Sequence, residues 1–105
     1  MKATILHNPR CSKSRATLAL LREAGADVSV VKYLIHPPSR DELARLVDRA
    51  GLSPRAILRR EIRMPDGADV LEAIAADPGL LERPLVETER GVRLCRPPER
   101  VRDIL

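Results

Sequence analysis

The chain has 105 residues and a formal net charge of +4, which fits one compact domain over residues 1–105 with one modest core. It contains no Phe or Trp and a single Tyr, so the core must be built from Leu, Ile, Val and Ala. Basic residues alternate with acidic ones and no aromatics are interleaved with them, which argues against nucleic-acid binding. No leader or long apolar segment is recognisable, so we expect a cytoplasmic protein that does not enter a membrane.

The first third of the chain predicts a strand, a helix and a second strand. Residues 3–6 form a short apolar run typical of a buried strand, and Asn8-Pro9 ends it. A helix is expected over about residues 11–24, with Gly25 as its stop. The β-branched run 28–34 predicts the next strand. Elements of these lengths predict a parallel strand pair joined by a crossover helix.

The middle of the chain predicts helices. Capping-box spacing, a Ser or Asp followed three residues later by Glu, begins one helix over about residues 39–50 and another over about 69–76. Between them, Ser53-Pro54 starts a shorter helix that ends near Arg59-Arg60. We expect these helices to form an inserted subdomain over about residues 39–79.

The last part predicts a hairpin and a terminal helix. Residues 85–88 and 92–95 flank Glu89-Arg90-Gly91, which indicates antiparallel strands with a short loop. A helix is expected to start at Pro97-Pro98. The full order, β-α-β, several helices, β-β, α, predicts an α/β protein of thioredoxin-like (glutaredoxin-like) fold with a mixed sheet and an inserted helical subdomain.

Cys11 is the leading candidate for chemistry. It follows a strand and starts a helix, where unpaired N–H groups and the positive end of the helix dipole would face it. Arg10, Lys13 and Arg15 add positive charge beside it. These features favour the nucleophilic thiolate and also prepare an anion site. The alternative for a free cysteine is a small buried hydrophobic residue.

Three neighbours of Cys11 are expected to border the substrate site. Ser14 stands where a dithiol oxidoreductase carries its second cysteine, so this CxxS segment cannot close a local disulfide and needs a thiol from elsewhere. His7 could donate to, or pair with, the thiolate, or could make a structural hydrogen bond at the strand end. Asn8 could orient the loop or simply be a turn residue before Pro9.

Three arginines at element boundaries are the other candidates, namely Arg59, Arg83 and Arg96. In a thioredoxin-like fold the loop before the hairpin faces the cysteine, and its X-Pro bond is commonly cis. That arrangement would bring Arg83 and Pro84 near Cys11. From pattern alone, each arginine could equally be a solvated surface charge.

The remaining cysteine, Cys95, ends the last expected strand, and we expect a structural or merely tolerated thiol, with a resolving role as the alternative. The two cysteines lack CxxC spacing and no paired His/Cys set accompanies them, so no metal site is predicted.

Nine residues around the cysteine, HNPRCSKSR over 7–15, resemble the active-site segment of the glutaredoxin-coupled arsenate reductases. Other segments are similar to further signatures of that family, in order along nearly the whole chain. They are Tyr33-Leu34 with 37–43, the run SPRAILR at 53–59, Arg83-Pro84, 94–97 and 103–105.

The resemblance implies arsenate reductase activity. Cys11 matches the catalytic cysteine, and His7 matches the histidine that helps to lower its pKa. Arg59, Arg83 and Arg96 match the arginines that hold the oxyanion. The implied reaction is attack of the thiolate on arsenate, formation of a mixed thiol adduct with glutathione, and reduction by glutaredoxin with release of arsenite. Glutathione would be a co-substrate and glutaredoxin a partner, with no bound cofactor.

Two departures from the family accompany the resemblance. The segment 61–82 is shorter than in typical members, and the chain stops at Leu105 without the usual tail. The shortening motivates a second hypothesis, a related glutathione-dependent thiol oxidoreductase with a different substrate. A third is a non-enzymatic regulator that binds RNA polymerase, as some relatives of the fold do; those regulators typically carry CxxC, whereas this chain has CxxS.

Overall fold

The computed structural model describes all 105 residues around a four-stranded mixed sheet of strand order β2-β1-β3-β4. β1 (Lys2–His7) pairs in parallel with β2 (Asp27–Lys32) and antiparallel with β3 (Leu85–Thr88). β3 pairs antiparallel with β4 (Gly91–Leu94). This arrangement confirms the predicted α/β, thioredoxin-like topology. None of the helices has the length and apolarity needed to cross a membrane.

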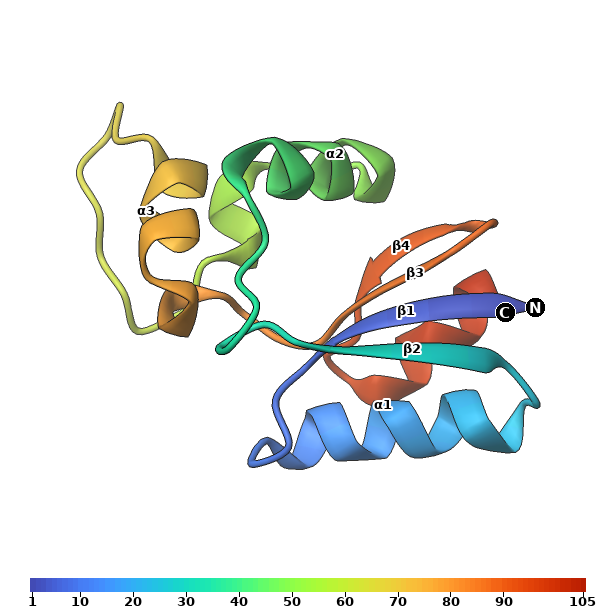
Figure 1. Cartoon of the computed structure of the whole chain (residues 1–105). Helices are drawn as coiled ribbons and strands as arrows, with labels where there is room; N and C mark the ends of the chain where they lie inside the picture. Colours follow the sequence, from blue (N-terminus) through green and yellow to red (C-terminus); the bar gives the residue numbers. More distant parts are fainter.

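Helices cover both faces of the sheet (Figure 1). The crossover helix α1 (Ser12–Glu23) and the C-terminal helical segment lie on one side, and α2 (Arg40–Ala50) lies on the other. Neighbouring side chains of a strand alternate between the two layers, because successive residues point to opposite faces. Ile5 and Val86 join the core beneath α1, whereas Leu6 and Leu85 join the larger core beneath α2.

The helical layer between β2 and β3 contains α2, a 3-10 turn (Pro54–Ile57), α3 (Val70–Ala76) and a second 3-10 turn (Pro78–Leu80). The predicted caps are present at both α-helices. The Ser39 hydroxyl accepts the Glu42 N–H at 3.1 Å, and the Asp69 carboxylate accepts the Glu72 N–H at 3.0 Å. Gly51 ends α2 at φ 68°, a conformation that favours glycine.

Two predicted elements end earlier than the sequence analysis expects. The second strand ends at Lys32, because the N–H groups of Ile35 and His36 both turn back to its carbonyl. The helix expected after Ser53-Pro54 is a single 3-10 turn that stops before Arg59.

The terminal helix is 3-10 over Pro98–Ile104, rather than α-helical. A 3-10 helix repeats every three residues, so Val101 and Ile104, three apart, both reach the core.

The hairpin differs by one residue from the expectation. Gly91 pairs with Thr88, which leaves Glu89-Arg90 as the loop and places Cys95 just beyond the strand.

Candidate active site

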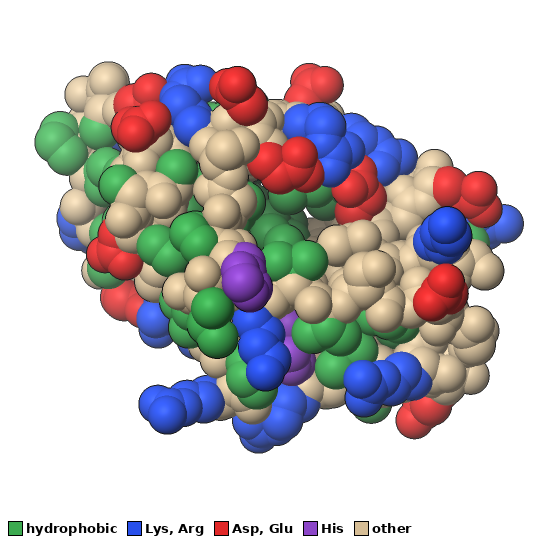
Figure 2. Space-filling model, viewed as in Figure 1, with side chains coloured by type: hydrophobic (Ala, Val, Ile, Leu, Met, Phe, Trp, Pro, Cys, Tyr) green, Lys and Arg blue, Asp and Glu red, His purple; other side chains and the backbone are tan.

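Cys11 lies at the N-cap of α1, where the chain leaves β1 and enters the helix, as the sequence predicts. The loop before it is held by its own backbone. The Cys11 N–H donates to the Asn8 carbonyl at 3.0 Å, and the Asn8 side-chain oxygen accepts the Arg10 N–H at 3.0 Å. The thiol is partly exposed and forms no disulfide. Figure 2 shows Lys and Arg side chains spread over the visible face, several of them at the lower left, where the loop before α1 lies in Figure 1.

The pKa of the Cys11 thiol lies below its ordinary value. Burial of the sulfur raises the pKa, but four groups favour the thiolate and outweigh that effect. Two are the backbone N–H groups of Ser14 and Lys13 at the start of α1. The Cys11 side chain makes no capping hydrogen bond to the helix. The others are the charge of Arg83 and a hydrogen bond from Arg96, whose Nη1 is 3.9 Å from Sγ.

These two arginines replace the local cations that the sequence suggested. The Arg15 guanidinium, one turn along the helix, donates instead to the Pro9 carbonyl at 2.9 Å. The largest side-chain contributions that lower the pKa of Cys11 come from the far end of the chain. The thiolate is therefore stabilised by tertiary structure as well as by the helix N-terminus.

His7 contacts Ser14, with 2.6 Å between His7 Nδ1 and Ser14 Oγ. The same hydroxyl accepts the Asn8 N–H at 3.1 Å, and it is fully buried. Burial lowers the pKa of His7, and nearby cations lower it further, so the imidazole is neutral at neutral pH. Of the two alternatives for His7, the structure shows the structural hydrogen bond. Any effect of His7 on Cys11 passes through Ser14, whose N–H faces the sulfur.

We expect His7→Ala to raise the apparent pKa of Cys11. Loss of the imidazole leaves the buried Ser14 hydroxyl without its 2.6 Å partner, and the first turn of α1 then holds its N–H groups less firmly. The pH dependence of Cys11 alkylation measures this shift. His36→Ala, which alters an exposed loop histidine, is the matched control. An alkylation profile that does not move in folded His7→Ala protein would reject the role of His7.

Arg59 is brought to the site by a short antiparallel pairing of residues 57–59 with residues 80–82. The Glu82 N–H donates to the Ile57 carbonyl at 2.7 Å, and the Arg59 N–H donates to the Leu80 carbonyl at 2.9 Å. Leu58 and Leu81 form an isolated bridge between them. The chain then passes directly into Arg83, and the charges of Arg59 and Arg83 both act on Tyr33 and on Glu61.

Arg83 lies just before β3 and Arg96 just after β4, and both approach Cys11 from these two ends of the hairpin. Each precedes a cis proline, which matches the expectation for Arg83-Pro84 and adds Arg96-Pro97. Arg96 Nη1 donates to the Arg83 carbonyl at 3.0 Å and also reaches Cys11 Sγ. The structure thus brings Arg83 and Arg96 to Cys11 from positions more than seventy residues further along the chain.

Two guanidinium groups of the arginine cluster, defined as Arg59, Arg83 and Arg96, have buried Nε donors that make no hydrogen bond of good geometry. Arg83 Nε is buried and makes no hydrogen bond. Arg59 Nε also makes none of good geometry, although Glu61 Oε1 lies at ion-pair distance, 2.7 Å. Buried unpaired donors are costly, and an oxyanion would satisfy them.

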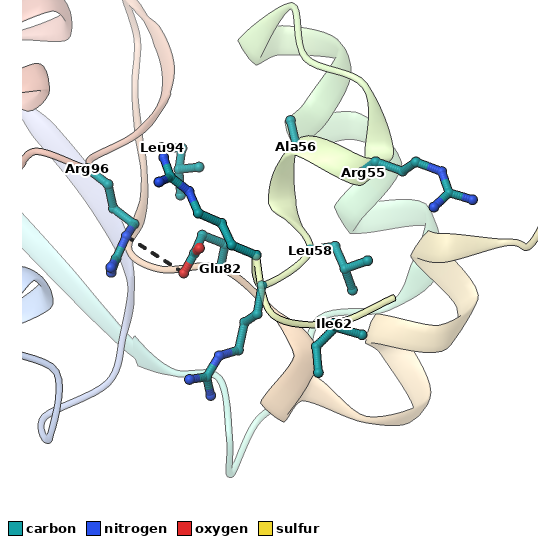
Figure 3. Close-up of a pocket in the computed structure, with 9 residues that line it drawn as sticks. Arg55, Ala56, Leu58, Ile62, Glu82, Leu94 and Arg96 are labelled. Carbon is teal, nitrogen blue, oxygen red and sulfur yellow. Dashed lines mark ion pairs between the residues drawn. The ribbon is translucent and has the colours of Figure 1, made fainter. Parts of the chain in front are cut away.

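A cavity of about 310 Å³ opens beside the cluster (Figure 3). Arg59 and Arg96 line it, and Arg96 connects it to Cys11 because its guanidinium contacts both the sulfur and the cavity residue Glu82. The nine lining residues are Arg55, Ala56, Leu58, Arg59, Arg60, Ile62, Glu82, Leu94 and Arg96.

Two residues of this region were missed by the sequence analysis as site candidates. Glu82 is buried among the arginines, and its only sequence signal is its position directly before Arg83. Tyr33, the single aromatic residue, is buried nearby. Burial raises its pKa, which Asn8 and Arg83 partly offset.

Cys95 is fully buried against the α1 face of the sheet, and burial raises the pKa of its thiol to about 12. The only hydrogen bond of the Cys95 thiol is a weak one to the Arg93 carbonyl, at 3.6 Å. These features describe a core side chain and not an accessible second thiol.

We expect Cys95→Ala to leave the alkylation kinetics of Cys11 unchanged and to lower the free energy of unfolding by about 1–2 kcal/mol, the effect of a small core cavity. Alkylation of the native protein should modify one thiol, and alkylation in denaturant should modify two. Rapid modification of both thiols in the native protein would contradict this assignment.

A partly exposed thiol of lowered pKa, at the N-terminus of the crossover helix and close to Arg83 and Arg96, is typical of a thiol-dependent enzyme on a thioredoxin-like fold. The chain belongs to the ArsC family, whose model matches residues 6–104.

Named relatives agree with this assignment. The chain is 44% identical to the arsenate reductase of Rhizobium meliloti (strain 1021) over 115 residues, covering 100% of this chain and 82% of that protein. It is 42% identical to an arsenate reductase of Escherichia coli over 112 residues, covering 97% and 79%. The solved structure of the arsenate reductase from Vibrio cholerae superposes with a TM-score of 0.93 at 41% identity, covering 100% of this chain and 98% of that one.

Proposed function

We propose that this protein is an arsenate reductase whose nucleophile is the Cys11 thiolate. The observation that carries the proposal is the convergence of Arg83 and Arg96 on the sulfur, beside a cavity that also contains Arg59. The relatives at 42% and 44% identity are named arsenate reductases, which supports the same substrate.

The charges of the site suit this reaction. Arsenate and a thiolate repel each other, so attack requires cations that neutralise both at short range. The planar guanidinium forks can hold separate oxygens and leave the arsenic open to the sulfur. The buried and unused Nε donor of Arg83 is suited to one of those oxygens.

In the first step Cys11 Sγ forms a bond to arsenic, and one arsenic–oxygen bond breaks, with that oxygen leaving as water. Glutathione then forms a second sulfur–arsenic bond, and a second arsenic oxygen leaves as water. The glutaredoxin thiolate attacks the glutathione sulfur, and the bond between that sulfur and arsenic breaks with its electron pair left on arsenic, so As(V) becomes As(III) while glutathione and glutaredoxin form a mixed disulfide. Water then cleaves the remaining bond between Cys11 Sγ and arsenic, which frees the thiol and releases arsenite.

The cysteine inventory supports reduction by external thiols. Ser14 occupies the position of a local resolving cysteine, and Cys95 is buried with a raised pKa. Neither can supply the second sulfur, so the chain depends on thiols that other molecules bring.

The test is arsenate-dependent oxidation of NADPH in the presence of glutathione, glutaredoxin and glutathione reductase. We expect turnover with the complete system and none when glutathione or glutaredoxin is left out. Equal rates after thioredoxin and its reductase replace glutaredoxin would reject the proposed coupling. No turnover with active glutaredoxin would reject arsenate and favour a glutathione-dependent oxidoreductase of another substrate.

A further inference from the structure

Glu82 is a buried carboxylate inside the arginine cluster. The residue is 5% exposed, and its Oε1 lies 3.3 Å from Arg83 Nη1 and 3.7 Å from Arg96 Nε. Figure 3 shows the carboxylate directed toward Arg96 at the cavity wall. Its backbone is held by the 2.7 Å hydrogen bond to the Ile57 carbonyl, which leaves the side chain facing the cavity.

A carboxylate at this position works against simple anion binding. It occupies the arginines that an anion needs, and it repels any negative charge that enters. Both arginines contact Oε1, whereas Oε2 accepts no hydrogen bond in the structure. An ionised carboxylate can only accept hydrogen bonds, so Oε2 offers the cavity one acceptor among many donors.

We propose that Glu82 makes this site selective for oxyanions that carry a proton. Oε2 accepts the O–H of hydrogen arsenate while Arg59, Arg83 and Arg96 bind the other oxygens. The inference rests on the proposed arsenate chemistry for its substrate, and it assigns Glu82 as the residue that determines specificity within that site.

The protonation states of the competing anions allow Glu82 to discriminate between them. Arsenate and phosphate keep at least one proton at neutral pH, whereas sulfate keeps none and would place a bare oxygen against Oε2. A site built to pair with a hydroxyl rejects an analogue that lacks it, because the acceptor is then left unpaired beside like charge. A hydrogen bond to a charged group corresponds to a preference of at least about tenfold.

The experiment measures how phosphate and sulfate, two anions that are not reduced here, protect Cys11 from alkylation at constant ionic strength. In the wild-type protein, phosphate should protect at concentrations at least about tenfold below those of sulfate. Glu82→Gln is neutral at this position and offers an N–H donor. Sulfate should therefore protect this variant at a much lower concentration, and the ratio of the protecting concentrations of sulfate and phosphate should approach one.

Glu61→Gln is the matched control. Glu61 is an exposed carboxylate paired with Arg59 at 2.7 Å, so its replacement makes the same charge change at the edge of the cluster. Glu61→Gln should improve protection by phosphate and by sulfate equally and leave the ratio of their protecting concentrations unchanged.

Equal protection by the two anions in the wild-type protein would overturn the inference, and so would protection by neither. An unchanged ratio in Glu82→Gln would overturn it as well, because Glu82 would then only repel anions in general. If Glu82→Gln does not fold, as judged by thermal unfolding, the wild-type comparison decides alone.

The outcome is separable from that of the proposed function. A phosphate preference without arsenate turnover would reject the substrate and keep the selectivity. Turnover with equal protection by sulfate would reject only the role of Glu82.

Discussion

Replacing Cys11 with Ser is expected to reduce arsenate turnover at least about a thousandfold, to the background of the assay. Serine fits the same N-cap, but its hydroxyl is far less acidic than a thiol whose pKa is already lowered. It therefore forms no bond to arsenic at neutral pH. The coupled NADPH assay measures the loss, and thermal unfolding should show a fold of nearly unchanged stability.

The control for this variant is Cys95→Ala, which removes the other thiol of the chain. It should retain turnover, because Cys95 is buried in the core and does not touch the arginine cluster. Substantial turnover in Cys11→Ser, or loss of turnover in folded Cys95→Ala, would contradict the assignment of the nucleophile.

Replacing Arg96 with Ala should lower turnover by about 10²- to 10³-fold, the effect of removing one preorganised donor at a charged reaction centre. The same change should raise the apparent pKa of Cys11. Arg96 stabilises the thiolate through its 3.9 Å contact, so its loss favours the protonated thiol. The thiolate fraction at neutral pH then falls, and the alkylation profile moves to higher pH.

Two further variants separate geometry from net charge. Arg100→Ala removes one positive charge from an exposed position four residues along the chain and should leave turnover and alkylation nearly unchanged. Arg96→Lys keeps the charge but lacks the guanidinium fork that reaches Cys11, the Arg83 carbonyl and Glu82 together. Its turnover should therefore be little higher than that of Arg96→Ala. Equal losses in Arg96→Ala and Arg100→Ala would show that only net charge matters.

The parts of the fold with short-range signals were predictable from sequence. The alternation of apolar residues, the caps at Ser39 and Asp69, and the glycine stops all act within a few residues. The form of the terminal helix was not predictable, because the choice between α and 3-10 depends on how Val101 and Ile104 meet the core.

The site divides in the same way. The placement of Cys11 at a helix start could be predicted, since strand, turn and helix are adjacent in sequence. The grouping of the arginines rested on family resemblance, because tertiary pairing brings them together. Glu82 was missed because a charged residue beside an arginine resembles an ordinary surface position, and only the fold buries it.

The pairing of residues 57–59 with residues 80–82 also bears on how this family tolerates changes of length. The Arg59 N–H donates a hydrogen bond to the Leu80 carbonyl. This bond joins the two ends of the segment between Arg59 and Leu80 and fixes the backbone position of Arg59. The match to the Rhizobium protein extends over 115 residues against the 105 of this chain, so the two proteins differ in length within the matched region. Doubling the length of a flexible loop raises the free-energy cost of closing it by only about 0.6 kcal/mol. The segment between Arg59 and Leu80 can therefore become longer or shorter while the backbone of Arg59 keeps its position in the site.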